Sequence, residues 1–362
     1  TLFIVTIVTT TLAGAEFTTG RSLIFGDPLM GWGDFLTGFQ YSFPFLLFLT
    51  VHEFGHYITA RLYQIRVTLP YYIPFWFGFI PSFGTMGAVI KIQGVIFSRK
   101  QFFDIGVAGP LAGFVLAVGV LWYAFLHLPP PEHIFNIHPE YEQFGLDYAN
   151  HVYQGNSGGS IAIGSNLLFY FFSNYVAPDP SYVPNPYEII HYPWILAGYL
   201  ALFFTSLNLM PIGQLDGGHI LYGLFGFKSH EKISKILFVG FVFYAGLGLI
   251  TANDHPDDLL WGVPLYSLFL YNALYNVFED IKNKLLLTIS VFAVQYLLTF
   301  IFPDITGYAG WLLFALLIGR VLGIQHPQAI YDDPLDWKRK TLGWVAFIVF
   351  ILCFSIEPFL ID

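Results

Sequence analysis

Residues 51–60 read VHEFGHYITA, and this stretch decides how the rest of the chain is interpreted. If it is helical, His52 and His56 lie four residues apart on one face and can offer two nitrogens to one metal ion. Glu53, beside the first histidine, can then reach a water that the metal activates. The apolar run 43–51 just before the motif is typical of a membrane span. The pattern therefore predicts a hydrolytic zinc site inside a membrane helix.

The composition of the whole chain indicates a membrane protein. Of the 362 residues, 56% are hydrophobic, 20% are aromatic and 11% are charged, whereas about a quarter of residues are charged in soluble domains. So many aromatic side chains would crowd an aqueous surface, but in a bilayer they can face lipid or the headgroups. The net charge of −9 and the lack of a basic stripe argue against a nucleic-acid partner. The single cysteine, Cys353, excludes an intrachain disulfide and a zinc site built from cysteines.

Apolar runs predict an all-α polytopic membrane protein with about eight or nine transmembrane helices, because a helix needs about 20 residues to cross the hydrocarbon. The runs are 1–15, 35–60, 103–127, 193–215, 234–251, 258–277, 285–302, 308–323 and 341–357. We expect one integral membrane domain over 1–362, with a catalytic core at 35–220 and additional transmembrane helices at 234–357. Because residue 1 is Thr and an apolar run begins at once, we expect the chain to begin within a longer sequence.

The distribution of Lys and Arg predicts the orientation, because short cytoplasmic loops carry an excess of positive charge. If Arg61 is cytoplasmic, alternation of the spans places every Lys and Arg except Arg21 on that side. The segment 129–192 contains no Lys or Arg and includes turn-rich stretches such as GNSGGS, so we expect it to be an extracytoplasmic loop of irregular structure. His56 would lie toward the cytoplasmic end of its span.

Residues 67–97 are apolar but cannot form one continuous helix, because Pro70, Pro74 and Pro81 interrupt them. We expect a re-entrant segment that ends in a short strand over Met86 to Ile92, where β-branched residues gather. Non-helical backbone at membrane depth persists only where protein or a water-filled cavity covers it. The segment is therefore predicted to lie near the active site.

A catalytic zinc takes a third protein ligand, and the strongest candidate is Asp216 in NLMPIGQLDGGHI, residues 208–220. Asp216 follows the span 193–215 at its cytoplasmic end, which is also the predicted depth of His56. The alternative is that Asp216 caps the next helix. His219 could be a ligand, but a supporting partner or an interfacial histidine fits better. Asn208 either holds the substrate backbone or an oxyanion, or it caps a helix broken after it.

Three motifs, HEFGH, GVAGPLAGF at residues 106–114 and NLMPIGQLDGG, together resemble the site-2 protease family of intramembrane zinc metalloproteases. Without a visible PDZ insertion, the chain looks most like the PDZ-lacking branch found in bacteria and chloroplasts. The resemblance implies zinc ligands at His52, His56 and Asp216, a catalytic acid/base at Glu53 and a substrate contact at Asn208. Leu209 stands where the family usually has Pro. We assign the glycines of GVAGPLAGF to close helix packing against the zinc-bearing helix.

A transmembrane substrate has to be unwound and held extended before a peptide bond can be cut, and an extended chain can add to an exposed strand edge. We therefore expect Met86, Ala88, Val89 and Ile90 to bind the substrate backbone. The alternative is a short hairpin that only plugs the mouth of the cavity.

The sequence thus predicts a membrane-embedded metalloprotease with one Zn²⁺ per chain, whose partners are transmembrane protein substrates and the lipid bilayer. We expect it in a bacterial inner membrane or an organellar membrane, with its active site toward the cytoplasmic face; the oligomeric state stays open. The main alternative is a transporter or channel, because buried ionisable residues also mark ion pathways. A catalytically inactive scaffold is a second alternative. A third is another type of zinc protease with Glu279 as ligand, although that residue reads more simply as a solvated charge.

Overall fold

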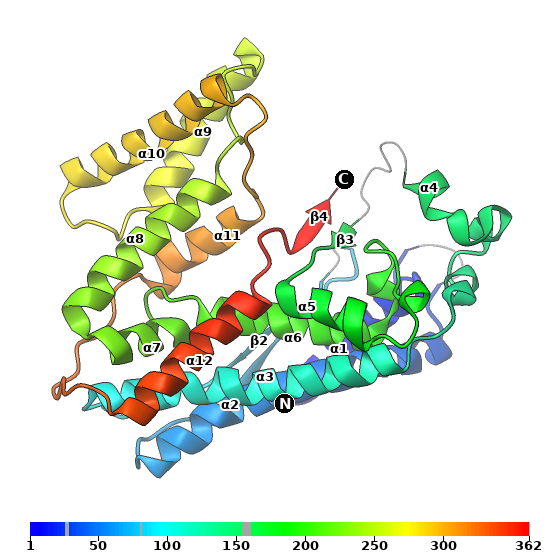
Figure 1. The fold of residues 1–362 in the computed structure, drawn as a ribbon, viewed down its shortest axis with the longest axis horizontal. Helices are drawn as coiled ribbons and strands as arrows, with labels where there is room; N and C mark the ends of the chain where they lie inside the picture. Colours follow the sequence, from blue (N-terminus) through cyan, green and yellow to red (C-terminus); the bar gives the residue numbers. More distant parts are fainter. Residues whose placement is uncertain (26–28, 80–81, 154–160, 362) are drawn as a thin grey trace. The chain divides into compact units, whose positions relative to one another are not determined.

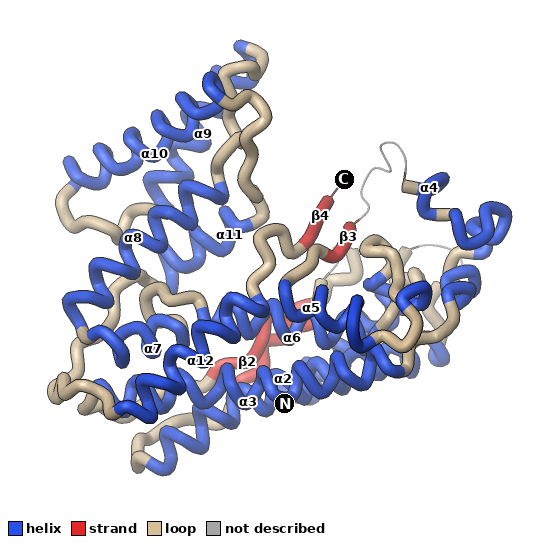
Figure 2. Tube along the Cα trace, in the orientation of Figure 1, coloured by secondary structure: helices blue, strands red, loops and turns tan. Residues whose placement is uncertain are grey.

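The computed structural model describes residues 1–25, 29–79, 82–153 and 161–361. Within these ranges the chain is mostly helical with a few short strands, as predicted (Figures 1 and 2). It divides into two compact units. Unit 1 contains residues 1–96, 107–208 and 345–362, and unit 2 contains residues 97–106 and 209–344. The prediction of a single integral membrane domain stays a prediction.

Unit 1 carries the HEFGH motif and the loop 129–192. Outside that loop its elements are α1 (Leu2–Thr19), α2 (Trp32–Leu62), β1 (Tyr71–Phe75), β2 (Gly84–Val89), α3 (Arg99–Leu126, counted here from residue 107), α6 (Pro193–Leu209, counted here to residue 208), the end of α12 (Trp337–Cys353, counted here from residue 345) and β4 (Phe359–Ile361). Between α3 and α6 lie η1 (Pro131–Asn136), η2 (Pro139–Asp147), α4 (Ala149–Val152), β3 (Ile161–Ile163), α5 (Leu167–Phe171), η3 (Phe172–Val176), η4 (Pro180–Tyr182) and η5 (Ile189–His191).

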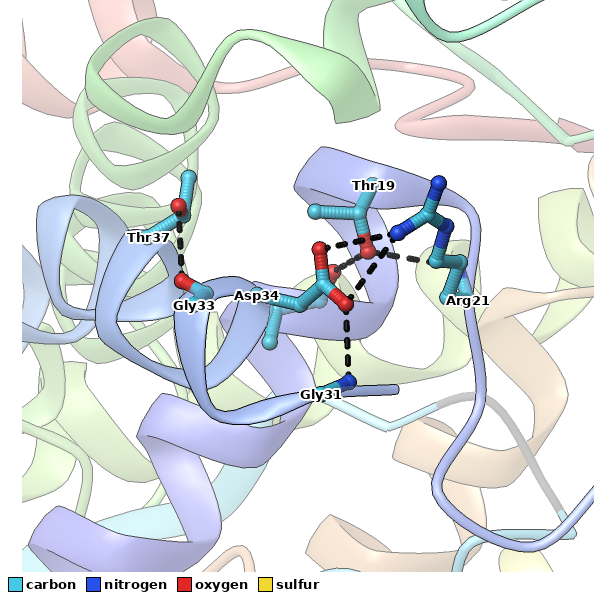
Figure 3. Close-up of polar contacts among 7 residues, drawn as sticks. Thr19, Arg21, Gly31, Gly33, Asp34 and Thr37 are labelled. Atoms are coloured by element: carbon cyan, nitrogen blue, oxygen red, sulfur yellow. Dashed lines mark hydrogen bonds and ion pairs between the residues drawn. The ribbon is translucent and has the colours of Figure 1, made fainter. Parts of the chain in front are cut away.

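Helices α1 and α2 pack closely because a glycine stands where they meet. A Cβ atom on Gly38 would lie 2.1 Å from the carbonyl oxygen of Thr11, so only glycine fits there. Beside it, the hydroxyls of Thr11 and Ser42 are hydrogen-bonded at 2.9 Å. Figure 3 shows how the connection between the helices is held: Arg21 forms an ion pair of 3.3 Å with Asp34, which also accepts a hydrogen bond from the backbone N–H of Gly31, the residue just before α2. These contacts fix where α2 begins.

Strands β1 and β2 form an antiparallel hairpin that contacts both α1 and α2. The Thr9 hydroxyl of α1 donates to the Gly84 carbonyl at 2.7 Å, and the Tyr72 and Thr50 hydroxyls are hydrogen-bonded at 2.7 Å. The strand expected over 86–92 therefore exists, but it begins two residues earlier and ends at Val89. Ile90 lies beyond its end, and Pro81 lies outside the described residues.

The loop 129–192 contains more regular structure than its composition suggests. Short 3₁₀ and α-helical turns follow one another, and Ile134, Tyr141 and Tyr148 form a small buried cluster. Strand β3 pairs antiparallel with β4 from the end of the chain. The GNSGGS stretch falls within 154–160, outside the described residues. A local apolar cluster explains the turns, because buried aromatic side chains can hold irregular backbone in one conformation.

Unit 2 is built from helices. In chain order they are the first residues of α3, then α7 (Asp216–Phe225), α8 (Phe227–Ala245), α9 (Pro256–Ala273), α10 (Ile281–Ile301), α11 (Trp311–Leu316), η6 (Leu317–Leu322) and α12 (Trp337–Cys353, counted here to residue 344). Helix α7 packs against α8, α9 against α10, and α11 against both α8 and α9.

Three described helices are long and apolar enough to cross a membrane: α1, α3 and α10. Shorter apolar helices occur at 167–176, in α6 and at 311–322. A membrane protein is thus supported, whereas the predicted count of about eight or nine spans is not confirmed and stays a prediction.

Candidate metal centre

Helix α2 places the three polar side chains of the HEFGH motif in the interior of unit 1. His52, Glu53 and His56 are 3%, 7% and 6% exposed. The two histidines are one turn apart, and their Nε2 atoms lie 3.1 Å from each other. Ionisable groups inside an apolar helix are costly, so a burial of this kind indicates a function.

The spacing of the two imidazoles fits a zinc ion. Zn–N bonds of about 2.0–2.1 Å at tetrahedral angles separate two ligand nitrogens by about 3.3 Å, close to the 3.1 Å between His52 and His56. The donor set is also suitable, because imidazole nitrogens are common zinc ligands. Two side chains on one helix could therefore supply half of a tetrahedral site.

Helix α3 approaches the two histidines through glycines. A Cβ atom on Gly109 would lie 2.1 Å from Nε2 of His56, and one on Gly113 would lie 3.2 Å from Cβ of His52. On the facing side, a Cβ atom on Gly55 of α2 would lie 2.7 Å from the carbonyl oxygen of Ala108 in α3. The packing role predicted for GVAGPLAGF is thus observed for these glycines. Gly106 differs: within unit 2 it packs against His219 of α7.

Asn208 of α6 contacts the motif. Its Nδ2 atom lies 3.4 Å from Nε2 of His52. It lies inside the helix, one residue before the end, so the alternative of a helix cap is wrong. An amide in this position can donate to an atom bound beside His52.

The β1–β2 hairpin lies beside the same turn of α2. Tyr72 of β1 bonds to Thr50, one turn before the motif, and its hydroxyl is within electrostatic range of Glu53. Tyr72 is the partner of Ala88 in the register of the hairpin. In β2 the side chains of Met86 and Val89 are 61% and 49% exposed. The short β segment is thus found next to Glu53.

Asp216 lies in unit 2, as the first residue of α7, and is partly buried. The N-cap position belongs to Leu215 and shows no side-chain cap, so the capping alternative for Asp216 is wrong. Cβ atoms on Gly217 and Gly218 would lie 2.0 Å and 2.2 Å from the carbonyl oxygens of Leu209 and Gly213. The two glycines therefore let the loop after α6 close onto the start of α7, which holds the Asp216 carboxylate at a helix N-terminus, where a negative charge is favoured.

A buried group of histidines in unit 2 was not foreseen. His219 Nδ1 and His326 Nε2 are 2.7 Å apart, and His326 is 4% exposed beside Tyr222 and His230. No local pattern could have revealed the pair, because 107 residues separate its members.

Glu279, the ligand of a rival zinc site, is exposed just before α10. Its position fits the simpler interpretation of a solvated charge.

Comparison with known proteins identifies relatives of this arrangement. The model of peptidase family M50 matches residues 40–247. The "probable zinc metalloprotease EGY1, chloroplastic" of Oryza sativa subsp. japonica is 28% identical over 212 residues, 59% of this chain and 31% of that protein. The protein of the same name from Arabidopsis thaliana is 30% identical over 219 residues, which are 59% of this chain and 33% of that protein's length. The "probable zinc metalloprotease EGY2, chloroplastic" of Arabidopsis thaliana is 29% identical over 188 residues, which are 52% of this chain and 29% of that protein's length.

The aligned chain thus spans about a third of the length of these relatives. No solved structure matches the chain. The family match contains the HEFGH motif, GVAGPLAGF and the Asp216 segment.

Proposed function

The chain belongs to peptidase family M50, the site-2 protease family, and from this premise we propose that it is an intramembrane zinc metalloprotease that cuts peptide bonds within or near the transmembrane segments of membrane-anchored proteins. One observation carries the proposal: two buried histidines of one helix hold their Nε2 atoms 3.1 Å apart, next to a buried glutamate. The relatives named as zinc metalloproteases support the choice of metal and reaction.

We assign His52, His56 and Asp216 as the ligands of one zinc ion. Two imidazole nitrogens and a carboxylate oxygen are a known ligand set for catalytic zinc, with a fourth position left open. The Asp216 segment lies within the family match, together with the HEFGH motif, and this supports the choice of Asp216.

A bound zinc ion supplies Lewis acidity, which polarises the substrate carbonyl and makes water a nucleophile near neutral pH. The Glu53 carboxylate removes the proton of the attacking water and passes it to the leaving amine. Asn208 donates from its amide to the oxygen on which negative charge develops.

We propose that β2 receives the substrate as an added strand, with backbone contacts at Met86, Ala88 and Val89 and at Ile90 just past the strand. The exposed Met86 and Val89 side chains support this role, and so does the contact between Tyr72, the partner of Ala88, and the turn before Glu53. Main-chain hydrogen bonds would give affinity for any unwound segment, whatever its side chains.

Val89→Pro tests strand addition, because proline removes one backbone donor from β2. We expect cleavage of a single-span substrate to fall about tenfold, the effect of one or two lost hydrogen bonds, while the zinc content stays the same. Val95→Pro, in the irregular chain after the strand, is the control and should cleave normally. Equal cleavage by Val89→Pro and wild type would contradict strand addition and favour the alternative, in which the hairpin only plugs the mouth of the cavity.

The chloroplastic relatives favour an organellar membrane, with a bacterial inner membrane as the alternative. We propose that the active site opens toward the positively charged, cytoplasm-equivalent face, since only that face needs to supply water. The loop 129–192 would then lie on the opposite side, and the helices at 234–357 would complete the membrane domain.

A cleavage assay decides between the protease and the main alternative, a transporter or channel. The full chain is reconstituted into vesicles with a single-span model protein, and the products are analysed by mass spectrometry. We expect a cut within or next to the span, which disappears after removal of zinc with a chelator and returns on its addition. Vesicles that show no product but a zinc-independent solute flux would establish the transporter instead.

A further inference from the structure

A second group of metal-binding side chains lies in the loop before α6. It consists of His138, Glu188 and His191, whose ligand atoms all lie within 4.8 Å of one another. The Nε2 atoms of His138 and His191 are 3.2 Å apart, and Nε2 of His191 is 3.6 Å from Oε2 of Glu188. All three belong to unit 1, and none is part of the HEFGH site.

The outer nitrogen of each imidazole is already engaged with an acceptor. Nδ1 of His191 lies 2.5 Å from the Phe17 carbonyl oxygen, and Nδ1 of His138 lies 3.0 Å from a carboxylate oxygen of Glu140. A carbonyl or a carboxylate can only accept, so each Nδ1 carries the proton. In the neutral rings both Nε2 atoms are therefore bare lone pairs, which face each other without a hydrogen between them.

The carboxylate is oriented in the same way. The Tyr153 hydroxyl donates to Oε1 of Glu188, whereas Oε2 has no hydrogen-bond partner although Glu188 is only 1% exposed. That oxygen is the one nearest to His191. A buried, unsatisfied acceptor costs free energy unless a cation or donor reaches it.

From this geometry we infer that His138, Glu188 and His191 bind a zinc ion, separate from the ion of the HEFGH site. Two nitrogens and one oxygen converge, and the 3.2 Å between the nitrogens is close to the roughly 3.3 Å expected at a tetrahedral zinc. Each ligand is held from behind by a hydrogen bond, as is typical of metal-binding histidines and carboxylates. The ring of Tyr141 stacks on His138 at 4.6 Å and limits its rotation.

The site borders a cavity on the side of His191. A cavity of about 300 Å³ is lined in part by His127, His133 and His191. His191 belongs to the loop and contacts the Phe17 carbonyl of α1. A bound ion would therefore fix the loop against α1. We assign it a structural role in holding this loop.

Zinc content tests the site. The full chain is purified in detergent, stripped with a chelator, and titrated with zinc alone, and the bound metal is measured by mass spectrometry. We expect two zinc ions per chain in wild type and one in His138→Ala. The matched control is His151→Ala, a half-exposed histidine of the same loop, which should keep two. A His138→Ala chain that binds as much zinc as wild type overturns the inference. The short distance between the His138 and His191 rings would then be explained by a proton shared between their Nε2 atoms.

Two further variants keep the test independent of the proposed protease site. His52→Ala should bind one ion, and the double variant His52→Ala/His138→Ala none. In the His52→Ala background, zinc should raise the thermal midpoint, since binding to the folded form stabilises it, and this rise should vanish with His138→Ala. Glu188→Gln preserves the shape of the side chain and should weaken zinc binding at least tenfold. An unchanged affinity in Glu188→Gln would count against the carboxylate as ligand.

Discussion

Replacing Glu53 by Gln is expected to lower peptide-bond cleavage by about 10²- to 10⁴-fold, the usual contribution of a general acid–base group. Gln has the size of Glu but cannot take a proton from water, so the substitution removes the chemistry and preserves the packing of a side chain that is only 7% exposed. The zinc content should equal that of wild type, because Glu53 is not one of the proposed ligands. The measurement is the rate of product formation from a single-span protein, with zinc quantified in the same preparation.

The control for this result is Glu279→Gln, which removes one carboxylate at an exposed position before α10. Its cleavage rate should match wild type, because solvated surface charges contribute little. Retention of the wild-type rate in Glu53→Gln would overturn the mechanism, whatever the zinc content.

Gly109→Ala is expected to lower both zinc binding at the HEFGH site and cleavage, the latter by about 10²-fold or more. The new Cβ would lie 2.1 Å from Nε2 of His56, a distance that carbon atoms do not tolerate, so the ring has to move. A displacement of about 1 Å of a catalytic group can cost about 10²-fold in rate. Moreover, the displaced atom is the one proposed to bind the metal. The zinc content should fall by one ion per chain.

Gly119→Ala is the matched control, because Gly119 belongs to the same helix and nothing lies within 4 Å of its Cβ position. Both substitutions remove a glycine from a helix interior and should favour the helix by similar amounts. A loss seen only in Gly109→Ala therefore reports the contact with His56. If the two variants retain equal zinc and activity, α3 does not approach His56 as closely as described.

Much of the candidate site follows from the sequence because it depends on local spacing. Histidines four residues apart meet on any helix, so the pairing of His52 and His56 needs no knowledge of the rest of the chain. The strand near Met86 was also predicted, from three interrupting prolines and a β-branched tail. Its end at Val89 was not, since register depends on the pairing with β1.

Contacts between segments far apart in the chain could not be predicted from the sequence. Asn208 was a candidate because of its motif, but its position 3.4 Å from His52 depends on how α6 packs in unit 1. Likewise, His138 and His191 are separated by 53 positions and carry no recognisable motif. The sequence interpretation of this loop as irregular overlooked both histidines.

The sequence by itself determined that this is a membrane protein and that His52 and His56 share one helical face, because composition and helical periodicity act over short stretches of chain. Only the tertiary structure decided which glycine of α3 touches His56, which amide reaches His52 and that His138, Glu188 and His191 converge before α6. Those facts depend on packing between segments far apart in the chain, and such packing is fixed by the shape and volume of many side chains together.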